Sequence, residues 1–159
     1  MTLEQLGSLG EMVGAIGVIL SLLYVGKQLA QNNRNQRIAA MQSNNDAYMQ
    51  NAATLAMHAE TWAIGINSYS SMELHKKVEF GFLLMTIFRQ SEQSYFLHKE
   101  GVLPADVLNK GLLMIASGLA YPGFKEWWDA RKDYFDDGFR EKLESINQDV
   151  STKPLYENF

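Results

Sequence analysis

The feature that most constrains this chain is an uncharged stretch near its start. No charged side chain occurs from Met12 to Gly26, where only Ser21 and Tyr24 carry polar side chains. As a helix this stretch rises about 22 Å. Its neighbours from Leu9 to Ala30 extend it to about 20 apolar residues, with the Lys27 ammonium reaching the interface, and a bilayer core about 30 Å thick requires that length. The stretch therefore predicts one transmembrane helix.

Two alternatives compete with a membrane span. A secretory signal peptide has a positively charged start and a small-x-small cleavage site. The residues before this stretch carry Glu4 and Glu11 and no Lys or Arg, so the charge pattern argues against a signal peptide. A buried helix of a soluble domain is the second alternative, and it stays open because length and composition alone do not distinguish it from a span.

Small residues recur along one side of the predicted span. At steps of three or four residues they are Gly7, Gly10, Gly14, Gly17 and Ser21. The opposite side carries larger aliphatic residues, namely Leu9, Val13, Ile16, Leu20 and Leu23. Small residues let two helix backbones approach closely in lipid, where no hydrophobic effect drives helices together. We therefore expect this Gly/Ser stripe to be a helix–helix interface, and its period of about 3.5 residues favours a left-handed bundle.

The same spacing continues through Tyr24 and then, beyond the span, mainly through amide side chains, among them Gln28, Gln31 and Asn35. No Pro or Gly occurs between Lys27 and Ala63, so nothing there ends a helix early. The segment also lacks the mixed charge pairs of a freely solvated helix, which suggests that it is covered on more than one side. A merely soluble linker helix is the alternative.

Charge and capping signals orient the helix. Basic residues follow the span at Lys27, Arg34 and Arg37, and none precedes it. Because cytoplasmic flanks carry the excess of Lys and Arg, we expect the N-terminus outside and the rest of the protein in the cytoplasm. Thr2 and Gln5 have the spacing of a capping box, so the helix can begin almost at the first residue.

Start and stop signals divide the remaining chain into short helices, and no strand pattern occurs. Turn formers over 63–71 and a Ser70–Glu73 capping box predict a helix over 71–100, which Gly101 ends. Pro104 lies in the first turn of a second helix, which runs to 120 and is followed by a corner at 121–123. An aromatic helix over 124–135 comes next, and Asp136 caps a last helix to 148. We expect a transmembrane helix over 1–30, an amide-rich helical extension over 31–62, an α-helical cytoplasmic domain over 63–149 and a tail over 150–159. The expected fold class is all-α, with one N-terminal transmembrane helix continuing into a long helix and a small helical bundle.

No residue cluster predicts catalysis or a metal site. The net charge of −4 argues against nucleic acid as a partner. The chain has no cysteine, which excludes disulfides and thiolate chemistry. Its histidines, His58, His75 and His98, lack ligand spacing. We therefore expect no metal, no cofactor and no enzymatic activity.

Three further features concern packing. Trp127 and Trp128 are adjacent and point about 100° apart on a helix, so we expect one in the core and the other against a partner. If Glu92 is buried, it should pair with Arg89 or Lys99. The acidic group Asp133, Asp136, Asp137 and Glu141 lacks the ligand order of a calcium loop, so we expect a solvated helix cap there.

Three stretches together resemble a family of uncharacterised small bacterial membrane proteins with one N-terminal span. They are the opening LGxxxGAIGVxxSLxYVGxQ with its Asn/Gln-rich continuation, RQSEQSYFLHKEGVLPADV from Arg89 to Val107, and PGFKEWWDARKDYFDDGFREKL from Pro122 to Leu143. They cover about half of the chain. The resemblance implies the bacterial inner membrane and an α-helical soluble part. It carries over no catalytic residue.

Two functional hypotheses follow. In the first, the chain is a non-enzymatic homo-oligomer of the membrane. In a ring of five or more subunits, Gln28, Gln31 and Asn35 would surround the inner mouth of a channel-like pore or form the oligomer seam, and Glu11 would surround the outer mouth. In the second, the chain is an accessory or scaffold subunit whose span docks on a larger membrane complex. Self-association of the isolated protein separates the two.

Overall fold

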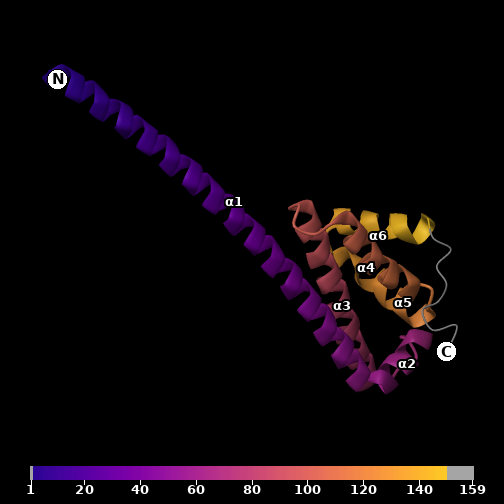
Figure 1. The fold of residues 1–159 in the computed structure, drawn as a ribbon. Helices are drawn as coiled ribbons and strands as arrows, with labels where there is room; N and C mark the ends of the chain where they lie inside the picture. Colours follow the sequence, from indigo (N-terminus) through magenta and orange to yellow (C-terminus); the bar gives the residue numbers. More distant parts are fainter. Residues whose placement is uncertain (1, 150–159) are drawn as a thin grey trace. The chain divides into compact units, whose positions relative to one another are not determined.

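The computed structural model describes residues 2–149, apart from the side chains of Leu6, Leu9, Gln148 and Asp149. All regular structure in this range is helical, which confirms the all-α class (Figure 1). The elements are α1 (Leu3–Met57), α2 (Ala59–Asn67), α3 (Leu74–Lys99), α4 (Ala105–Gly118), α5 (Pro122–Arg131), the short 3-10 helix η1 (Lys132–Tyr134) and α6 (Asp137–Asp149). The expected tail over 150–159 lies outside the described residues.

The chain divides into two compact units, an N-terminal helix unit (residues 1–40) and a helical domain (residues 41–159). The last part of α1 belongs to the helical domain, which therefore begins within the segment expected to form a helical extension. At the other end of α1, the Gln5 side chain accepts from the Thr2 backbone N–H, and the Gln5 N–H donates to the Thr2 hydroxyl. This reciprocal pair is the predicted capping box.

The break after α1 lies earlier than the sequence indicated. α1 ends at Met57, and His58 leaves the helical conformation with φ −112° and ψ 27°. Gly65, which we expected in a turn, lies instead inside α2 and is buried there. A Cβ at Gly65 would overlap the Phe80 ring, so this glycine permits close packing of α2 on α3 rather than ending a helix.

The predicted Ser70–Glu73 capping box is also wrong. α3 begins at Leu74, and its N-cap residue Glu73 makes no side-chain cap. The Ser70 N–H donates to Glu126 of α5 at 2.8 Å, and the Ser70 carbonyl accepts from Lys77. The loop before α3 is therefore held by contacts with α5 and α3 rather than by its own capping side chain.

Two other helix ends follow the predicted signals. Gly101 adopts φ +68° after α3, the Val102 N–H donates to the Leu97 carbonyl, and the Gly101 N–H donates to the His98 carbonyl. This pattern is the Schellman motif, in which a left-handed glycine ends the helix. At α6, the Asp136 carboxylate accepts from the Phe139 N–H at 3.0 Å, so the predicted acidic cap is confirmed.

Aromatic side chains fill the core of the helical domain. The Phe88 ring of α3 stacks on Trp128 of α5 at 4.6 Å between centroids, with planes 10° apart, and on Trp127 at 5.2 Å. Phe135, just after η1, and Phe139, at the start of α6, pack on the same cluster. Each such aromatic pair contributes about 0.5–1.5 kcal/mol beyond its burial. The cluster joins α3, α5 and α6.

We predict that Gly123→Ala separates α2 from α5. Gly123 is buried at the start of α5, where a Cβ would overlap the Gly65 carbonyl oxygen, and backbone cannot rotate away as a side chain can. Overpacking of this kind costs roughly 1–3 kcal/mol. The matched control is Gly111→Ala in α4, where a Cβ meets nothing within 4 Å.

The control should leave the free energy of unfolding unchanged or raise it by up to about 1 kcal/mol, because Ala favours the helix over Gly. Urea unfolding followed by near-ultraviolet circular dichroism measures both variants. Equal unfolding midpoints for the two would contradict the close approach of α2 and α5.

Candidate functional site

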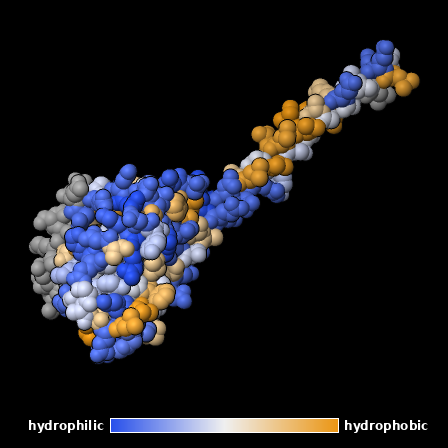
Figure 2. Space-filling model, turned by 180° about the vertical axis from the view of Figure 1, so that it is seen from behind, coloured by the Kyte–Doolittle hydropathy of each residue, from blue (hydrophilic) through white to orange (hydrophobic). Residues whose placement is uncertain are grey.

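The N-terminal helix unit presents apolar side chains in almost every direction. Its large apolar residues from Met12 to Val25 are 47–66% exposed, because a single helix cannot bury its own side chains. At 100° per residue those from Met12 to Leu23 point to every side except that of the Gly/Ser stripe, and Tyr24 and Val25 continue that side after Ser21. Figure 2 shows hydrophobic side chains gathered along this part of α1. Within the described chain, α1 is the one helix long and apolar enough to cross a membrane.

The Gly/Ser stripe is not covered by other parts of the described chain, and its one hydroxyl is hydrogen-bonded within the helix. A Cβ at Gly7, Gly10, Gly14 or Gly17 would meet no atom within 4 Å. The Ser21 hydroxyl donates to the Gly17 carbonyl at 2.8 Å. A serine bonded in this way needs no water, so the whole stripe is compatible with a lipid or protein environment.

The amides expected at a pore mouth or oligomer seam share one face of α1. Gln28, Gln31 and Asn35 are exposed and border a shallow, open hollow on the helix surface. Their spacing of three and four residues places them on a common face. Their role at a pore or seam stays a prediction.

Both tryptophans of α5 lie in the core, so the expectation that one of them faces a partner does not fit the structure. Trp127 is 0% exposed and Trp128 is 3% exposed. Their directions do differ, but α5 is short and enclosed on both sides: Gly81 of α3 lies beside the Trp127 nitrogen, and Phe139 of α6 packs edge-on against Trp128. Neither ring offers surface to another protein.

Glu92 is the buried carboxylate of the domain, and its predicted pairing with Arg89 is confirmed. One carboxylate oxygen accepts from the Arg89 guanidinium at 2.6 Å, and the other accepts from the Asp136 N–H at 2.7 Å. Lys99, the other predicted partner, lies over the Tyr95 ring instead. Glu92 therefore ties α3 to the start of α6, a structural role.

A second polar group holds α2 against α3. The Glu79 carboxylate accepts from the Thr61 hydroxyl at 2.6 Å and contacts the His58 ring, and Lys76 donates to the Thr61 oxygen at 2.8 Å. The hydrogen bond from Thr61 lowers the pKa of the Glu79 carboxyl below its usual value of about 4.5. The hydrogen bond with His58 and the charge of Lys76 act in the same direction. The three histidines lie apart, and across residues 2–149 no three metal-binding side chains gather in one place.

A pocket of about 580 Å³ lies within the helical domain, and sequence analysis did not predict it. It is bordered by the end of α1 and by α2, α3, α4 and α5. This volume falls in the range of roughly 300–1,000 Å³ that small-molecule sites occupy. The side chains that line it include Met41, Asn44, Asn45, Tyr48, Asn51, Leu55, Trp62, Ile66, Ile87, Gln90, Ser91, Ser94, Leu103, Val107, Leu108, Gly111, Leu112, Met114, Ile115, Tyr121 and Phe124.

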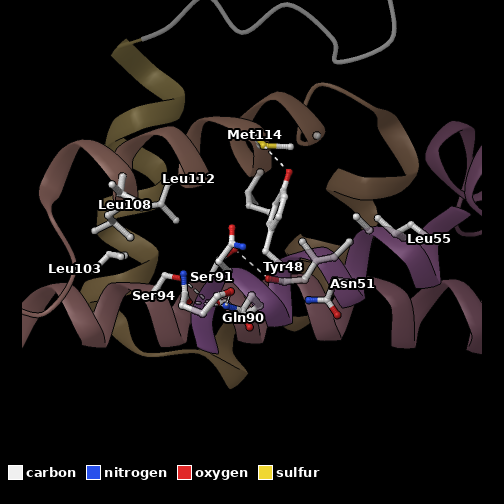
Figure 3. A pocket seen from close by; sticks show the side chains of 18 of the residues that line it. Tyr48, Asn51, Leu55, Gln90, Ser91, Ser94, Leu103, Leu108, Leu112 and Met114 are labelled. Carbon is white, nitrogen blue, oxygen red and sulfur yellow. Dashed lines mark hydrogen bonds between the residues drawn. The ribbon is translucent and has the colours of Figure 1, made fainter. Parts of the chain in front are cut away.

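The pocket has one polar wall and one apolar wall. α1 and α3 supply its amides and serine hydroxyls, whereas every lining residue of α4 is apolar. The Asn44 side-chain oxygen accepts from the Gln90 amide at 2.7 Å and from the Ser94 hydroxyl at 2.8 Å. Figure 3 shows Tyr48 reaching across the pocket to Met114, where its hydroxyl donates to the sulfur at 3.3 Å. The only sequence signals for this arrangement were the amide-rich character of the long helix and its lack of mixed charge pairs.

Comparison with protein-family models, with curated proteins and with solved structures finds no match to this chain. The resemblance to small bacterial membrane proteins therefore stays a prediction, and the candidate sites stand on their own residues.

We predict that Glu79→Gln destabilises the domain at neutral pH and that this effect fades in acid. A carboxyl whose pKa is lowered by folding stabilises the folded state above its unfolded pKa, and this contribution is lost as the pH falls through the lower, folded value. The variant should therefore unfold at a lower urea concentration than the wild type near about pH 7, and at nearly the same concentration near about pH 3.

Glu60→Gln is the matched control, because Glu60 belongs to the same helix α2 as Thr61 but is exposed. Its unfolding midpoint should follow the wild type at every pH. A difference between Glu79→Gln and the wild type that does not change with pH would show that the carboxylate charge is irrelevant.

Proposed function

We propose that this protein is a non-enzymatic, single-pass membrane protein that associates with copies of itself through the Gly/Ser stripe. The observation that carries the proposal is the uncharged helix from Met12 to Gly26, whose apolar side chains point outward and whose Ser21 hydroxyl is bonded within the helix. Burial of a large apolar side chain is worth about 1.5–3 kcal/mol. Nine such residues, about half to two-thirds exposed, represent an unfavourable term comparable to the roughly 5–15 kcal/mol stability of a whole domain. Something must cover this helix, and lipid covers it on all sides at once.

The proposal extends to the orientation of the chain. Lys27, Arg34 and Arg37 follow the span, and the acidic Glu4 and Glu11 precede it. This asymmetry favours a helical domain on the cytoplasmic side and the N-terminus on the outside, and the bacterial inner membrane fits the resemblance given above. In a ring of several copies, Gln28, Gln31 and Asn35 would form neutral amide rings at the inner mouth.

The stripe favours self-association because, from Gly7 to Ser21, its side of the helix carries no large side chain. Contact through glycines brings backbones together and gains dispersion energy that lipid tails cannot match. The remaining sides then face lipid. An accessory subunit that docks the same stripe on a larger complex is the alternative, and the two differ in whether the protein assembles alone.

We predict that the full chain stays in the membrane fraction after an alkaline carbonate wash, because a spanning helix is held by its apolar surface and not by charge. A double variant, Ile16→Glu with Leu20→Glu, should appear in the soluble fraction, since charged residues at the bilayer centre cost about 2.5–3.5 kcal/mol each on insertion scales. Release of the wild-type chain by carbonate would contradict the span.

We predict that Gly14→Leu with Gly17→Leu dissociates the assembly. The added side chains fill the stripe and prevent close backbone approach. Native mass spectrometry of the chain expressed alone, in nanodiscs or detergent, should give one defined oligomer for the wild type and smaller species for the variant. The matched control is Ala15→Leu with Gly26→Leu, which adds comparable bulk at positions more than about 100° from the stripe.

The control should assemble as the wild type does. An unchanged oligomer in the Gly14→Leu/Gly17→Leu variant would show that the stripe faces lipid or a loose lumen. A monomeric wild type would contradict self-association and turn the search to a partner chain, as the accessory-subunit alternative requires.

A further inference from the structure

We propose that the pocket of the helical domain binds an uncharged long-chain alcohol, a molecule with an alkyl or isoprenoid chain and a hydroxyl head. All of its lining residues belong to the helical domain (residues 41–159). The inference is therefore independent of the Gly/Ser stripe and of how the chain assembles.

The pocket is deep on its α4 side and open at its rim. Leu108, Leu112 and Ile115 form its base and are 1–7% exposed. Val107 and Met114, which line the pocket from a more exposed side of the same helix, are each 41% exposed. A ligand chain can therefore enter past the rim and cover apolar surface that water now contacts, at a gain of about 25 cal/mol per Å².

The charge of the lining determines the class of ligand. None of the described residues that border the pocket is Asp, Glu, Lys, Arg or His. A carboxylate, phosphate or ammonium group placed there would lose its hydration without gaining a counter-charge, which costs several kcal/mol. Fatty acids and phospholipid headgroups are disfavoured on this ground, and uncharged molecules are favoured.

The polar wall offers a donor and an acceptor on neighbouring side chains. The Asn44 oxygen is already used twice, by Gln90 and Ser94, whereas its amide nitrogen has no hydrogen bond to the part of the chain that the structure describes. The Gln90 side-chain nitrogen donates to the backbone and side-chain oxygens of Asn44, and no donor among the same residues reaches the Gln90 side-chain oxygen. A hydroxyl both accepts and donates, so one alcohol group can satisfy the Asn44 nitrogen and the Gln90 oxygen together.

The apolar remainder of the pocket suits a chain. Leu55, Trp62 and Phe124 border it from α1, α2 and α5. In Figure 3, Leu55 lies on the opposite side of Tyr48 from Ser94 and Leu103. The hydroxyl head and the chain of one molecule can therefore lie toward different ends of the same pocket.

Tryptophan fluorescence gives a direct test, because the chain has three tryptophans and only Trp62 borders the pocket. Bromine atoms on a bound chain quench an indole at contact. We expect a dibrominated octadecanol to quench the full-length protein in nanodiscs saturably. A dibrominated stearate of the same chain length should bind at least about tenfold more weakly at pH near 8, since its charge is unpaired. Trp62→Phe should remove the saturable signal.

Two pairs of variants locate the site. Gly111→Phe places a ring in open space beside the pocket and should reduce affinity for the brominated alcohol at least about tenfold, whereas Leu113→Phe, on the same helix but outside the lining, should leave it unchanged. Asn44→Asp keeps the oxygen that accepts from Gln90 and Ser94 but replaces the donor by a charge, and should weaken binding by about tenfold. Asn109→Asp, outside the lining, should not.

Equal affinity for the alcohol and the stearate would overturn the proposal, as would unchanged binding in Gly111→Phe. Absence of saturable quenching in the wild type would also overturn it. If the wild type shows no saturable quenching and Gly111→Phe alters the native mass of the assembly, the pocket is an interface with a second copy and not a site for an alcohol. The Gly14→Leu/Gly17→Leu variant should bind the alcohol as the wild type does, so failure of the stripe and failure of the pocket are separate results.

Discussion

The stacking of Phe88 on the two indole rings of α5 is the contact on which the helical domain depends. Phe88 lies at the middle of α3, and its contacts bring α5 and the start of α6 to one face of that helix. Phe80 and Leu84, at steps of four residues, continue this buried face toward α2. Because close packing of this kind leaves few voids, the positions of α2, α5 and α6 follow from one face of α3.

The side of α3 that adjoins this buried face borders the pocket. It presents Ser91 and Ser94, and the pocket lining also includes the small residues Gly111 of α4 and Ala52 of α1. A Cβ at Gly111 would meet no atom within 4 Å, so the small residue there leaves space between the helices. The hydrogen bonds from Gln90 and Ser94 to Asn44 then hold α1 in place without filling that space. Adjoining sides of one helix thus border the core and the candidate site.

Sequence reasoning succeeded where structure is determined by neighbours along the chain. The Thr2–Gln5 box, the left-handed Gly101 and the Asp136 cap each involve hydrogen bonds within a few residues, so their signals are visible in the sequence. Sequence reasoning failed where contact with a residue distant in the chain determines the local structure. Gly65 has the composition of a turn, but the Phe80 ring requires a glycine inside a helix there. The two tryptophans were assigned to different environments by helical geometry alone, whereas contacts from α3 and α6 bury both.

The two candidate sites differ in the same way, because one depends on residues that are near in sequence and the other on residues that are far apart. The Gly/Ser stripe repeats within one helix and is therefore a property of the sequence. The pocket requires Asn44 to contact Gln90 and Ser94, which lie more than forty positions later in the chain. No local sequence pattern predicts that contact. One local clue did exist: no Lys or Arg occurs from Ile38 to His75. Asp46 lies in the same stretch, so the clue concerns positive charge alone. Asn44, Asn45 and Asn51 border the pocket, and their amides give its polar wall hydrogen-bonding capacity without a charge that would face apolar α4 unpaired.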